Sequence, residues 1–210
     1  MPEQDIVVLA SRNRGKIREL ARLLEPFGIT LKGLDDFPDV GEIEETGTTF
    51  AENALLKACT VAKLTGHASI ADDSGLEVDF LGGAPGVYSA RYSDAPGRPA
   101  TDARNNEKLL VALSEAPEDA RGARFRCAMA ACKPEGGHIL ASGAWEGRIG
   151  FLPKGENGFG YDPLFFDPFL GRSAAELPME EKNACSHRAK AVAALMELWP
   201  GFWNTENADN

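Results

Sequence analysis

The sequence predicts an α/β fold with a mixed β-sheet and flanking helices. Short β-branched apolar runs, which are typical of buried strands, alternate with segments of helical periodicity. A two-residue alternation near residue 125 predicts a hairpin as well. Because strands, helices and a hairpin are intermixed and no repeat or linker interrupts them, we place one domain at residues 1–203. The polar segment 204–210 is expected to fray.

The first elements are a strand and a helix joined by a polar loop. The β-branched run Ile6–Ala10 predicts a buried strand, and Ser11–Lys16 predicts the loop. A helix follows and stops before Pro26, with one apolar face formed by Ile17, Leu20, Ala21 and Leu24. Residues 27–47 are acidic and are expected to be irregular.

The second helix has both of its ends marked in the sequence. Thr49 and Glu52 form a capping box at its start, and Gly66 follows its last apolar position. The apolar run that comes next predicts a strand with Asp72 and Asp73 at its tip, where Gly75 lets the backbone turn.

The remaining elements are a helix, a hairpin and a last helix. Residues 101–114 predict the helix, and the runs on either side of Lys133–Gly137 predict the hairpin. Ser186 is a candidate cap for the last helix, and Pro200 is expected to follow its end. The segment 154–162 is too rich in glycine for regular structure.

Composition restricts the class of protein and its partners. Hydrophobic residues make up 43% and charged residues 26% of the 210, as in an ordinary globular protein with one domain or one two-lobed domain. The formal charge of −10 argues against nucleic acid and anionic membranes as partners, because both repel an acidic surface. The four cysteines form no CxxC pair, and the N-terminus lacks the positive region of a signal peptide, so we expect a cytoplasmic protein with reduced thiols.

The adjacent carboxylates of Asp72 and Asp73 are the chemical centre of the sequence. Neighbouring side chains on an extended chain point in opposite directions, so one carboxylate can face a cleft while the other faces backbone or solvent. Two like charges side by side repel unless a cation or hydrogen bonds compensate them, and a divalent metal is one such cation. The alternative interpretation is an ordinary Asp-Asp-Ser-Gly turn.

The first loop combines a helix start with positive charge. Backbone N–H groups and the helix dipole favour an anion at such a place. The loop is not a Walker A motif, because Ala10 and Ile17 stand where that motif needs glycine and serine or threonine. A solvated basic helix start is the alternative. The residues of this loop are Ser11, Arg12, Asn13, Arg14, Gly15 and Lys16.

The second helix and the segment before it add polar groups to the Asp73 region. Asn53 and Lys57 lie four residues apart on one face, where they would either reach a phosphate or be solvated. Glu44 and Glu45 precede the helix and supply a further carboxylate. A glutamate and an aspartate, together with water and phosphate oxygens, make a normal magnesium site.

Two later segments carry aromatic and basic side chains. Gly155–Asp162 has the wrong glycine order for a Rossmann fingerprint; its aromatic residues either offer a flat face to a nucleobase or fill the core of a tight turn. Lys182, His187 and Arg188 cluster at the start of the last helix, where cations oppose the helix dipole. They indicate an anionic or electron-rich ligand, or else a plain surface cluster. All these groups together suit a nucleoside triphosphate with magnesium.

Six motifs, in order, resemble those of the inosine/xanthosine triphosphate pyrophosphatase family. The resemblance runs from about residue 6 to residue 199, and its one departure is Ser11-Arg12 where many members carry Thr-Gly. The motifs are Ser11-x-Asn13-x-x-Lys16, Thr46-Gly47-x-Thr49-Phe50-x-Glu52-Asn53-Ala54 with Lys57-Ala58, Ala71–Leu76, Gly82–Tyr92, Gly158–Pro163 and Glu181-Lys182-x-x-x-Ser186-His187-Arg188.

The resemblance implies a homodimer with an elongated α/β fold and two lobes around a central cleft. It also implies magnesium-dependent cleavage of ITP, dITP and XTP between the α and β phosphates, giving the monophosphate and pyrophosphate and removing these nucleotides from the pool. Glu44 and Asp73 would bind the metal, and Asp73 would also be the base for the attacking water. Because a carboxylate on magnesium is a weak base, we expect Asp73 chiefly to orient that water.

The resemblance further assigns the residues that would contact the nucleotide. Ser11, Asn13, Lys16 and Lys57 would hold the triphosphate, Phe159 would stack on the base, and the edge of the base would be read by Asp162, Lys182, His187 and Arg188. The full set of substrate-binding residues adds Arg12, Arg14, Gly15, Ser74, Gly160 and Tyr161.

Three rival interpretations are weaker. A haloacid-dehalogenase-type phosphohydrolase needs Asp-x-Asp at a strand end, whereas Asp72 and Asp73 are adjacent. A nucleotide-binding regulator would bind without turnover. Neighbouring pyrophosphatases that act on modified pyrimidine or canonical-base nucleotides share the architecture, but His187-Arg188 argue against them.

Overall fold

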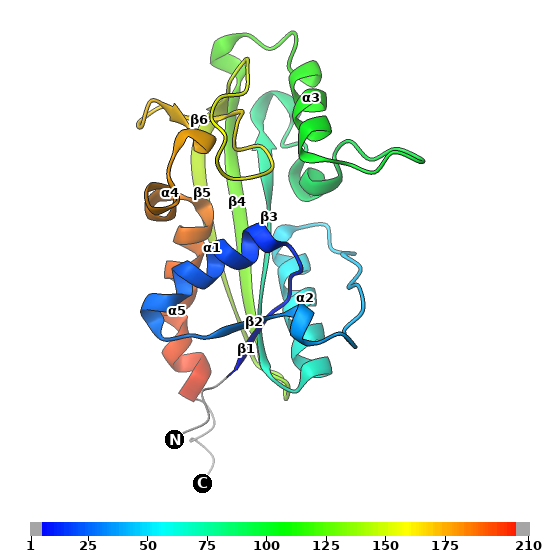
Figure 1. Ribbon diagram of the computed structural model, residues 1–210, viewed down its shortest axis with the longest axis vertical. Coiled ribbons are helices and arrows are strands. Elements are labelled where there is room, and N and C mark those ends of the chain that lie inside the picture. The colour runs from blue at the N-terminus through cyan, green and yellow to red at the C-terminus, as the bar shows by residue number, and fades with distance from the viewer. Residues whose placement is uncertain (1–5, 205–210) are drawn as a thin grey trace. The chain divides into compact units, whose positions relative to one another are not determined.

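The computed structural model describes residues 6–204 and contains a seven-stranded sheet in the order β2-β1-β3-β4-β5-β6-β7 (Figure 1). β1 pairs in parallel with β2 and β3, whereas β6 pairs antiparallel with β5 and β7. The predicted α/β class with a mixed sheet is therefore confirmed. The strands are β1 (Val7–Leu9), β2 (Leu31–Gly33), β3 (Ala68–Val78), β4 (Gly122–Cys132), β5 (His138–Ile149), β6 (Phe165–Asp167) and β7 (Arg172–Ser173).

Five α-helices lie in the described part of the chain. They are α1 (Arg14–Leu24), α2 (Phe50–Thr65), α3 (Asp102–Ala112), α4 (Met179–Cys185) and α5 (His187–Trp203). Within residues 6–204, no helix is long and apolar enough to cross a membrane. The frayed tail that we expect at 204–210 lies, from residue 205 onward, outside the described residues.

The chain forms two compact units, each with its own core. The first unit contains the described residues 6–73, 127–143 and 188–204, and the second contains residues 74–126 and 144–187. Peptide bonds cross between the units within β3, β4, β5 and α5.

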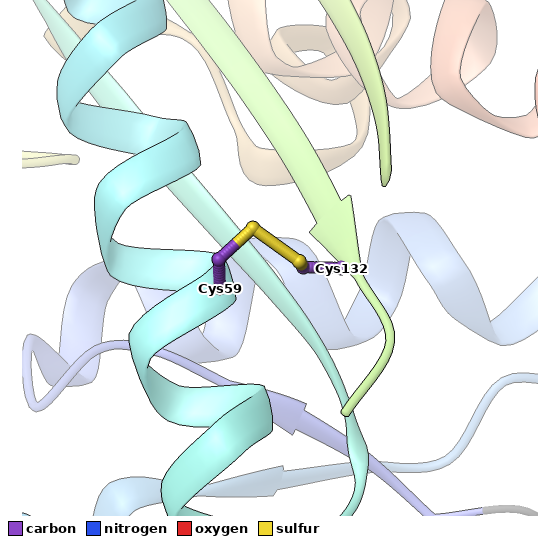
Figure 2. The surroundings of a disulfide bond; sticks show 2 residues. All are labelled: Cys59 and Cys132. Carbon is purple, nitrogen blue, oxygen red and sulfur yellow. A yellow bond between two sulfur atoms is a disulfide. The ribbon is translucent and has the colours of Figure 1, made fainter. Parts of the chain in front are cut away.

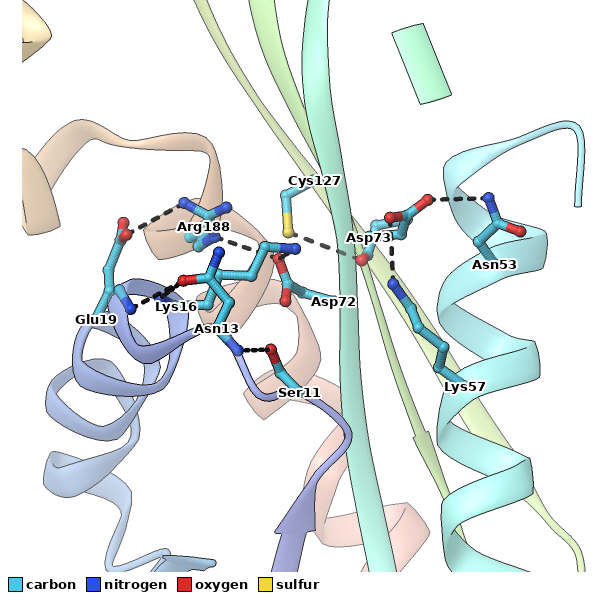
Figure 3. A network of polar contacts seen from close by, with 12 residues as sticks. Ser11, Asn13, Lys16, Glu19, Asn53, Lys57, Asp72, Asp73, Cys127 and Arg188 are labelled. Carbon is cyan, nitrogen blue, oxygen red and sulfur yellow. Dashed lines mark hydrogen bonds and ion pairs between the residues drawn. The ribbon is translucent and has the colours of Figure 1, made fainter. Parts of the chain in front are cut away.

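The first unit is a three-layer sandwich whose two apolar cores lie on opposite faces of the sheet. Ile70 of β3 packs in one core with α1 and α5, and Ala71 packs in the other core with α2. Figures 1 and 3 show α1 on one side of β3 and α2 on the other. The same two-residue alternation continues in β4, where Cys127, Met129 and Ala131 share the α1 side and Ala128, Ala130 and Cys132 share the α2 side.

Helix α2 is capped at both ends and is joined covalently to the sheet. The predicted capping box is present, because Thr49 accepts from the Glu52 N–H and the Glu52 carboxylate accepts from the Thr49 N–H, and Gly66 ends the helix with a φ of +68°. A disulfide joins Cys59 of α2 to Cys132 of β4 (Figure 2). The expectation of reduced thiols is therefore wrong for this pair, because the fold brings together two cysteines that are 73 residues apart.

The second unit has a separate apolar core. Leu76 and Val78 of β3 pack there with Phe125, Trp145 and Phe165 of the neighbouring strands, and α3 contributes Leu109. Outside the core, the guanidinium of Arg121 closes the end of α3 by donating to the carbonyls of Leu113, Ala116, Ile149 and Gly150.

Strand β3 differs from the expectation at its most important point. No turn occurs at Gly75; the strand continues from Ala68 to Val78, so Asp72 and Asp73 lie in its middle. Strand β1 stops at Leu9, which pairs with Ile70, but β4 on the other side of β3 is also eleven residues long. Because β4 is its neighbour over this length, the backbone of β3 has no need to turn where β1 ends.

The C-terminal helical region also differs from the expectation. Lys182 belongs to a separate helix, α4, instead of the start of the last helix, whereas Ser186 does directly precede α5, which begins at His187. Helix α5 continues through Pro200, where one backbone hydrogen bond is lost. Aromatic packing offsets that loss, since Trp199 and Trp203 stack with ring centroids 5.2 Å apart on either side of the proline.

Candidate active site

Asp72 and Asp73 project to opposite faces of β3. Asp72 follows the pattern of Ile70 and faces α1 and α5, whereas Asp73 follows Ala71 and faces α2. Figure 3 shows the two carboxylates on either side of the strand, each with its own partners. They are 2% and 6% exposed, respectively, so both are buried charges and each needs compensation. The prediction of opposite orientations is confirmed.

Asp72 is compensated by two cations. Its Oδ2 lies 3.1 Å from Lys16 Nζ and 3.3 Å from Arg188 Nε. Arg188 also reaches, through Nη1, Oε2 of the buried Glu19 at 3.1 Å. Burial alone would raise the pKa of Asp72, but the charges of Lys16 and Arg188 outweigh it, and the pKa lies well below its usual range.

The lowered pKa of Asp72 has a consequence for stability. The unfolded chain binds a proton more tightly than the folded one at this site, so the ionised carboxylate favours folding above the ordinary pKa of an aspartate. That contribution is lost as the pH falls. The Lys16–Asp72–Arg188–Glu19 cluster, with two cations and two carboxylates, is therefore a structural link between α1, β3 and α5.

Asp73 has a different set of partners, all from the α2 side. Asn53 Nδ2 donates to its Oδ2 at 3.1 Å, and Lys57 Nζ lies 3.2 Å from its Oδ1. The same Nζ contacts Glu45 Oε1 at 2.7 Å. Burial raises the pKa of Asp73, and the charge of Lys57 opposes this shift without cancelling it. For Lys57, burial lowers the pKa but the nearby Asp73 and Asp72 raise it further, so the net shift is upward.

Asn53 is buried and has a structural task that the sequence does not reveal. Its Oδ1 accepts from Gly47 N at 2.8 Å, which orients the amide so that Nδ2 faces Asp73. A Cβ at Gly47 would lie 2.6 Å from that Oδ1, so a side chain at position 47 would displace the amide. Gly47 and Asn53 together fix one hydrogen bond to Asp73.

The first loop begins α1, but several of its donors are already used. Asn13 is the N-cap, and its Oδ1 accepts from Gly15 N and Lys16 N. Ser11 Oγ accepts from Asn13 N at 3.1 Å, and Arg12 Nη2 donates to Val40 O. Arg14 is exposed. A pocket next to this loop is lined by Ser11, Arg12, Gly41, Glu42, Ile43 and Lys57, with Ala10 and Leu34.

The Asp73 side of the strand fits a divalent cation that also has substrate ligands. Among residues 6–204, no group of three or more His, Cys, Asp or Glu side chains is placed to hold a metal by itself. Two carboxylates, Asp73 and Glu45, do meet at one cation, the ammonium of Lys57. The predicted ligand Glu44 is exposed and has no contact with Lys57 among those that the structure shows. Magnesium is commonly held by one or two carboxylates, phosphates and water.

The second unit contains the aromatic and basic groups that the sequence predicts for the base. Asp162 is 2% exposed, and its Oδ2 accepts from Phe159 N at 2.9 Å and from Lys182 Nζ at 2.6 Å. Lys182 Nζ also lies 5.3 Å from the centre of the Phe159 ring. The lysine is thus held by a carboxylate and faces an aromatic ring, an arrangement that fixes both side chains.

The other predicted residues of the second unit are buried or partly buried. His187 stacks on Phe125, with ring centroids 4.9 Å apart and an angle of 19° between the rings. Tyr161 donates from its hydroxyl to Ser89 O at 2.8 Å, and burial raises its pKa. Ser74 follows Asp73 in β3 and is partly buried.

Comparison with known proteins identifies the family. Residues 7–198 match the model of the Ham1 family. A dITP/XTP pyrophosphatase of Nitratidesulfovibrio vulgaris is 62% identical over 200 residues, which cover 94% of this chain and 97% of that protein. The chain belongs to the Ham1 family. The resemblance to inosine/xanthosine triphosphate pyrophosphatases is therefore confirmed.

Other Ham1-related proteins agree in sequence and in fold. A dITP/XTP pyrophosphatase of Streptococcus thermophilus is 49% identical over 203 residues, which cover 96% of this chain and 62% of that longer protein. The solved structure of a HAM1 protein from Coxiella burnetii has a TM-score of 0.83 at 43% identity, covering 93% of this chain and 98% of that one. The seven-stranded mixed sheet thus agrees with the Ham1 fold.

Set against the Ham1 motifs, the structure groups the predicted residues by unit. The first unit contains the loop 11–16, Glu44, Lys57, Asp73 and Arg188. The second unit contains the other predicted site residues, which are Ser74, Phe159, Gly160, Tyr161, Asp162, Lys182 and His187. Sequence reasoning missed Glu19 entirely and left Asn53 undecided. One signal for Glu19 is its spacing: it lies three residues after Lys16, on the same face of α1 and next to the apolar Leu20.

Proposed function

We propose that the chain hydrolyses non-standard purine nucleoside triphosphates, namely ITP, dITP and XTP, to the monophosphate and pyrophosphate. The observation that carries the proposal is the buried Asp73 carboxylate, held by Asn53 and Lys57 beside Glu45. Related proteins of the Ham1 family are named for dITP and XTP. Removal of these nucleotides from the pool fits a cytoplasmic enzyme.

The triphosphate would be bound by the first unit. Lys57 and Lys16 supply ammonium groups next to the two aspartates, and Ser11 and Asn13 supply donors at the start of α1. Phosphoryl transfer is catalysed largely by positioning and by neutralisation of charge on the phosphate oxygens. Lysines that are already held by carboxylates are pre-organised for this task, because less conformational entropy is lost when the substrate binds.

Asp73 would orient the attacking water. Its carboxylate has a fixed direction, because Asn53 Nδ2 and Lys57 Nζ each hold one of its two oxygens. The burial that raises its pKa also makes it a better proton acceptor than an exposed aspartate. Ser74 is the next residue along β3 and would lie beside the reacting water.

A divalent metal, which we propose is Mg²⁺, would be held by Asp73 together with Glu44 or Glu45. It would neutralise phosphate charge and lower the pKa of the attacking water. The contacts of both Glu45 and Asp73 with Lys57 support Glu45 as the second carboxylate. Lys57 would then exchange part of its contact with the carboxylates for contact with the phosphates.

The base would be bound by Phe159, Asp162, Lys182, His187 and Arg188. Phe159 is the stacking surface, and Lys182 and Asp162 form a donor and acceptor pair next to it. Hypoxanthine and xanthine have acceptors at O6 and N7, to which His187 and Arg188 can donate. Adenine carries an amino group at position 6 and would leave buried donors unpaired, at a cost of roughly 1–3 kcal/mol per group.

We propose a homodimer as the functional form and expect no nucleic-acid or membrane partner. The net charge of −10 argues against nucleic acid and membranes as partners, since an acidic surface is repelled by polyphosphate backbones and by anionic lipids. The single two-lobed domain at residues 1–203 also stays a proposal; its support is the family match, which spans residues 7–198.

Analysis of the products of ITP tests the reaction directly. With magnesium present, we expect equal amounts of IMP and pyrophosphate, which phosphorus NMR distinguishes from orthophosphate. With a chelator in place of magnesium, turnover is expected to fall at least about 100-fold, because charge on the phosphates is no longer neutralised. Release of orthophosphate would contradict cleavage between the α and β phosphates. Tight binding of ITP without any product would favour the non-catalytic regulator instead.

A further inference from the structure

The segment Gly155–Asp162 carries Phe159 and follows an irregular path. Gly155, Gly158 and Gly160 have φ angles of +79°, +76° and +64°, a region that favours glycine. At Gly158, a Cβ would lie 2.0 Å from Oδ2 of Asp162, so this backbone packs directly against the carboxylate. Because a glycine-rich segment has little preference of its own for one conformation, contacts from other elements must select its path.

Helix α3 provides such a contact at one residue, Gly160. The Asp102 Oδ2 accepts from Gly160 N at 2.8 Å, and Asn106 Nδ2 donates to Gly160 O at 2.9 Å. Asp102 and Asn106 lie four residues apart, so both project from the same face of α3. A single helix, more than 50 residues earlier in the chain, thus holds both backbone polar groups of Gly160.

The helix that carries this pair is itself firmly fixed. Thr101 is the N-cap of α3 and accepts from Arg104 N. Leu109 is fully buried in the core of the second unit. Asp102 and Asn106 are therefore held in place by α3, independently of the glycine-rich segment, and give Gly160 fixed hydrogen-bond partners.

The orientation of the Asn106 amide is determined by its partner. Gly160 O is an acceptor and requires the Nδ2 side of the amide. The Oδ1 is buried and has no hydrogen-bond partner among the described residues. An aspartate at position 106 would have the same shape but would place an acceptor against an acceptor, so the contact is sensitive to chemistry as well as to size.

The contacts at Gly160 supplement others that hold the ends of the segment. Asn157 N donates to Ala175 O near its start, and the Asp162 carboxylate accepts from Phe159 N near its end. Phe159 is the residue immediately before Gly160, so rotation of the peptide between them would redirect the ring. From outside the segment, Asp102 holds the N–H of that peptide, and Asn106 holds the carbonyl of the next peptide, on the other side of Gly160.

We propose that Asp102 and Asn106 are positioning residues for the nucleobase: by holding Gly160, they present the ring of Phe159 in the orientation that stacks on the base. The inference rests on the proposed function, in which Phe159 contacts the base. Neither residue contacts the substrate. Their effect is on how well the base is bound, and hence on KM, whereas the first unit supplies the chemistry that sets kcat.

Steady-state kinetics with ITP test this assignment. Asn106→Ala and Asp102→Ala are each expected to raise KM roughly 5- to 10-fold, with kcat within about twofold of wild type, because each loses one hydrogen bond to Gly160. Asp102→Asn keeps an acceptor oxygen and is expected to restore a KM close to that of wild type. Glu107→Ala, at an exposed position on the same helix, is the matched control and should change neither parameter.

Combining these variants with Phe159→Ala separates positioning from general structure. Phe159→Ala alone should raise KM, and adding Asn106→Ala to it should raise KM no further, because Asn106 acts through the ring. Independent, multiplying effects would overturn the inference, as would an unchanged KM in both Asn106→Ala and Asp102→Ala. If Phe159→Ala itself left KM unchanged, the stacking role in the proposed function would be wrong, and the inference would fall with it.

Discussion

Replacing Asp73 with asparagine is expected to lower kcat for ITP by about a thousandfold while leaving the protein folded. The substitution removes the negative charge that would orient the water and bind the metal. Burial disfavours that charge in the folded protein, as the raised pKa of Asp73 shows, so a neutral side chain of the same shape costs little stability. Lys57 keeps Glu45 as a partner. Initial rates at saturating magnesium and urea unfolding measure the two quantities.

Asp72→Asn is the matched control, because the neighbouring carboxylate faces the other side of β3. This change removes the charge that pairs with Lys16 and Arg188, so we expect a loss of about 3 kcal/mol in unfolding free energy. Its effect on kcat should be about tenfold, exerted through the position of Lys16. Equal losses of turnover in the two variants would contradict the division of roles between the two faces.

Arg188→Ala is expected to have the second large effect, on stability and on selectivity together. The buried guanidinium contacts both Glu19 and Asp72, and its removal leaves Glu19 as an uncompensated buried carboxylate. We expect the unfolding free energy to fall by about 3–5 kcal/mol. Where the variant remains folded, the preference for ITP over ATP should fall roughly 10-fold or more, because a donor to the purine O6 and N7 is lost.

A second substitution shows which part of that effect is electrostatic. Adding Glu19→Gln to Arg188→Ala should recover about half of the lost unfolding free energy, because the uncompensated buried charge of Glu19 is removed. It should not recover selectivity, since the donor to the base is still absent. A variant that kept the ITP to ATP ratio of the wild type would contradict the base-reading role of Arg188. Unchanged stability would contradict the buried ion pairs.

The sequence predicts the chemistry of the site better than its contacts. The two-residue period of an extended chain is enough to place Asp72 and Asp73 on opposite faces, and the capping box is enough to start α2 at Phe50. Both are local effects. The contact of Arg188 with Asp72 spans 116 residues and that with Glu19 spans 169, and local periodicity carries no information over such distances.

The errors in the prediction have the same physical origin. Gly75 and Pro200 are residues that usually end an element, but each lies in an element whose neighbours support it. Strand β4 runs beside β3 past Gly75, and the packed tryptophans Trp199 and Trp203 hold the helix through Pro200. The Cys59–Cys132 disulfide likewise depends on how α2 lies on β4, which spacing along the chain does not indicate.

The most direct test of the central claim is a comparison of kcat/KM for ITP, XTP, GTP and ATP under identical magnesium concentrations. We expect kcat/KM for ITP and XTP to exceed kcat/KM for GTP and ATP at least about 100-fold, because the hydrogen-bond donors and acceptors of the site must match two positions of the base. Similar values for all four nucleotides would leave pyrophosphate release intact. They would contradict the claim that the residues around Phe159 and Arg188 select non-standard purines.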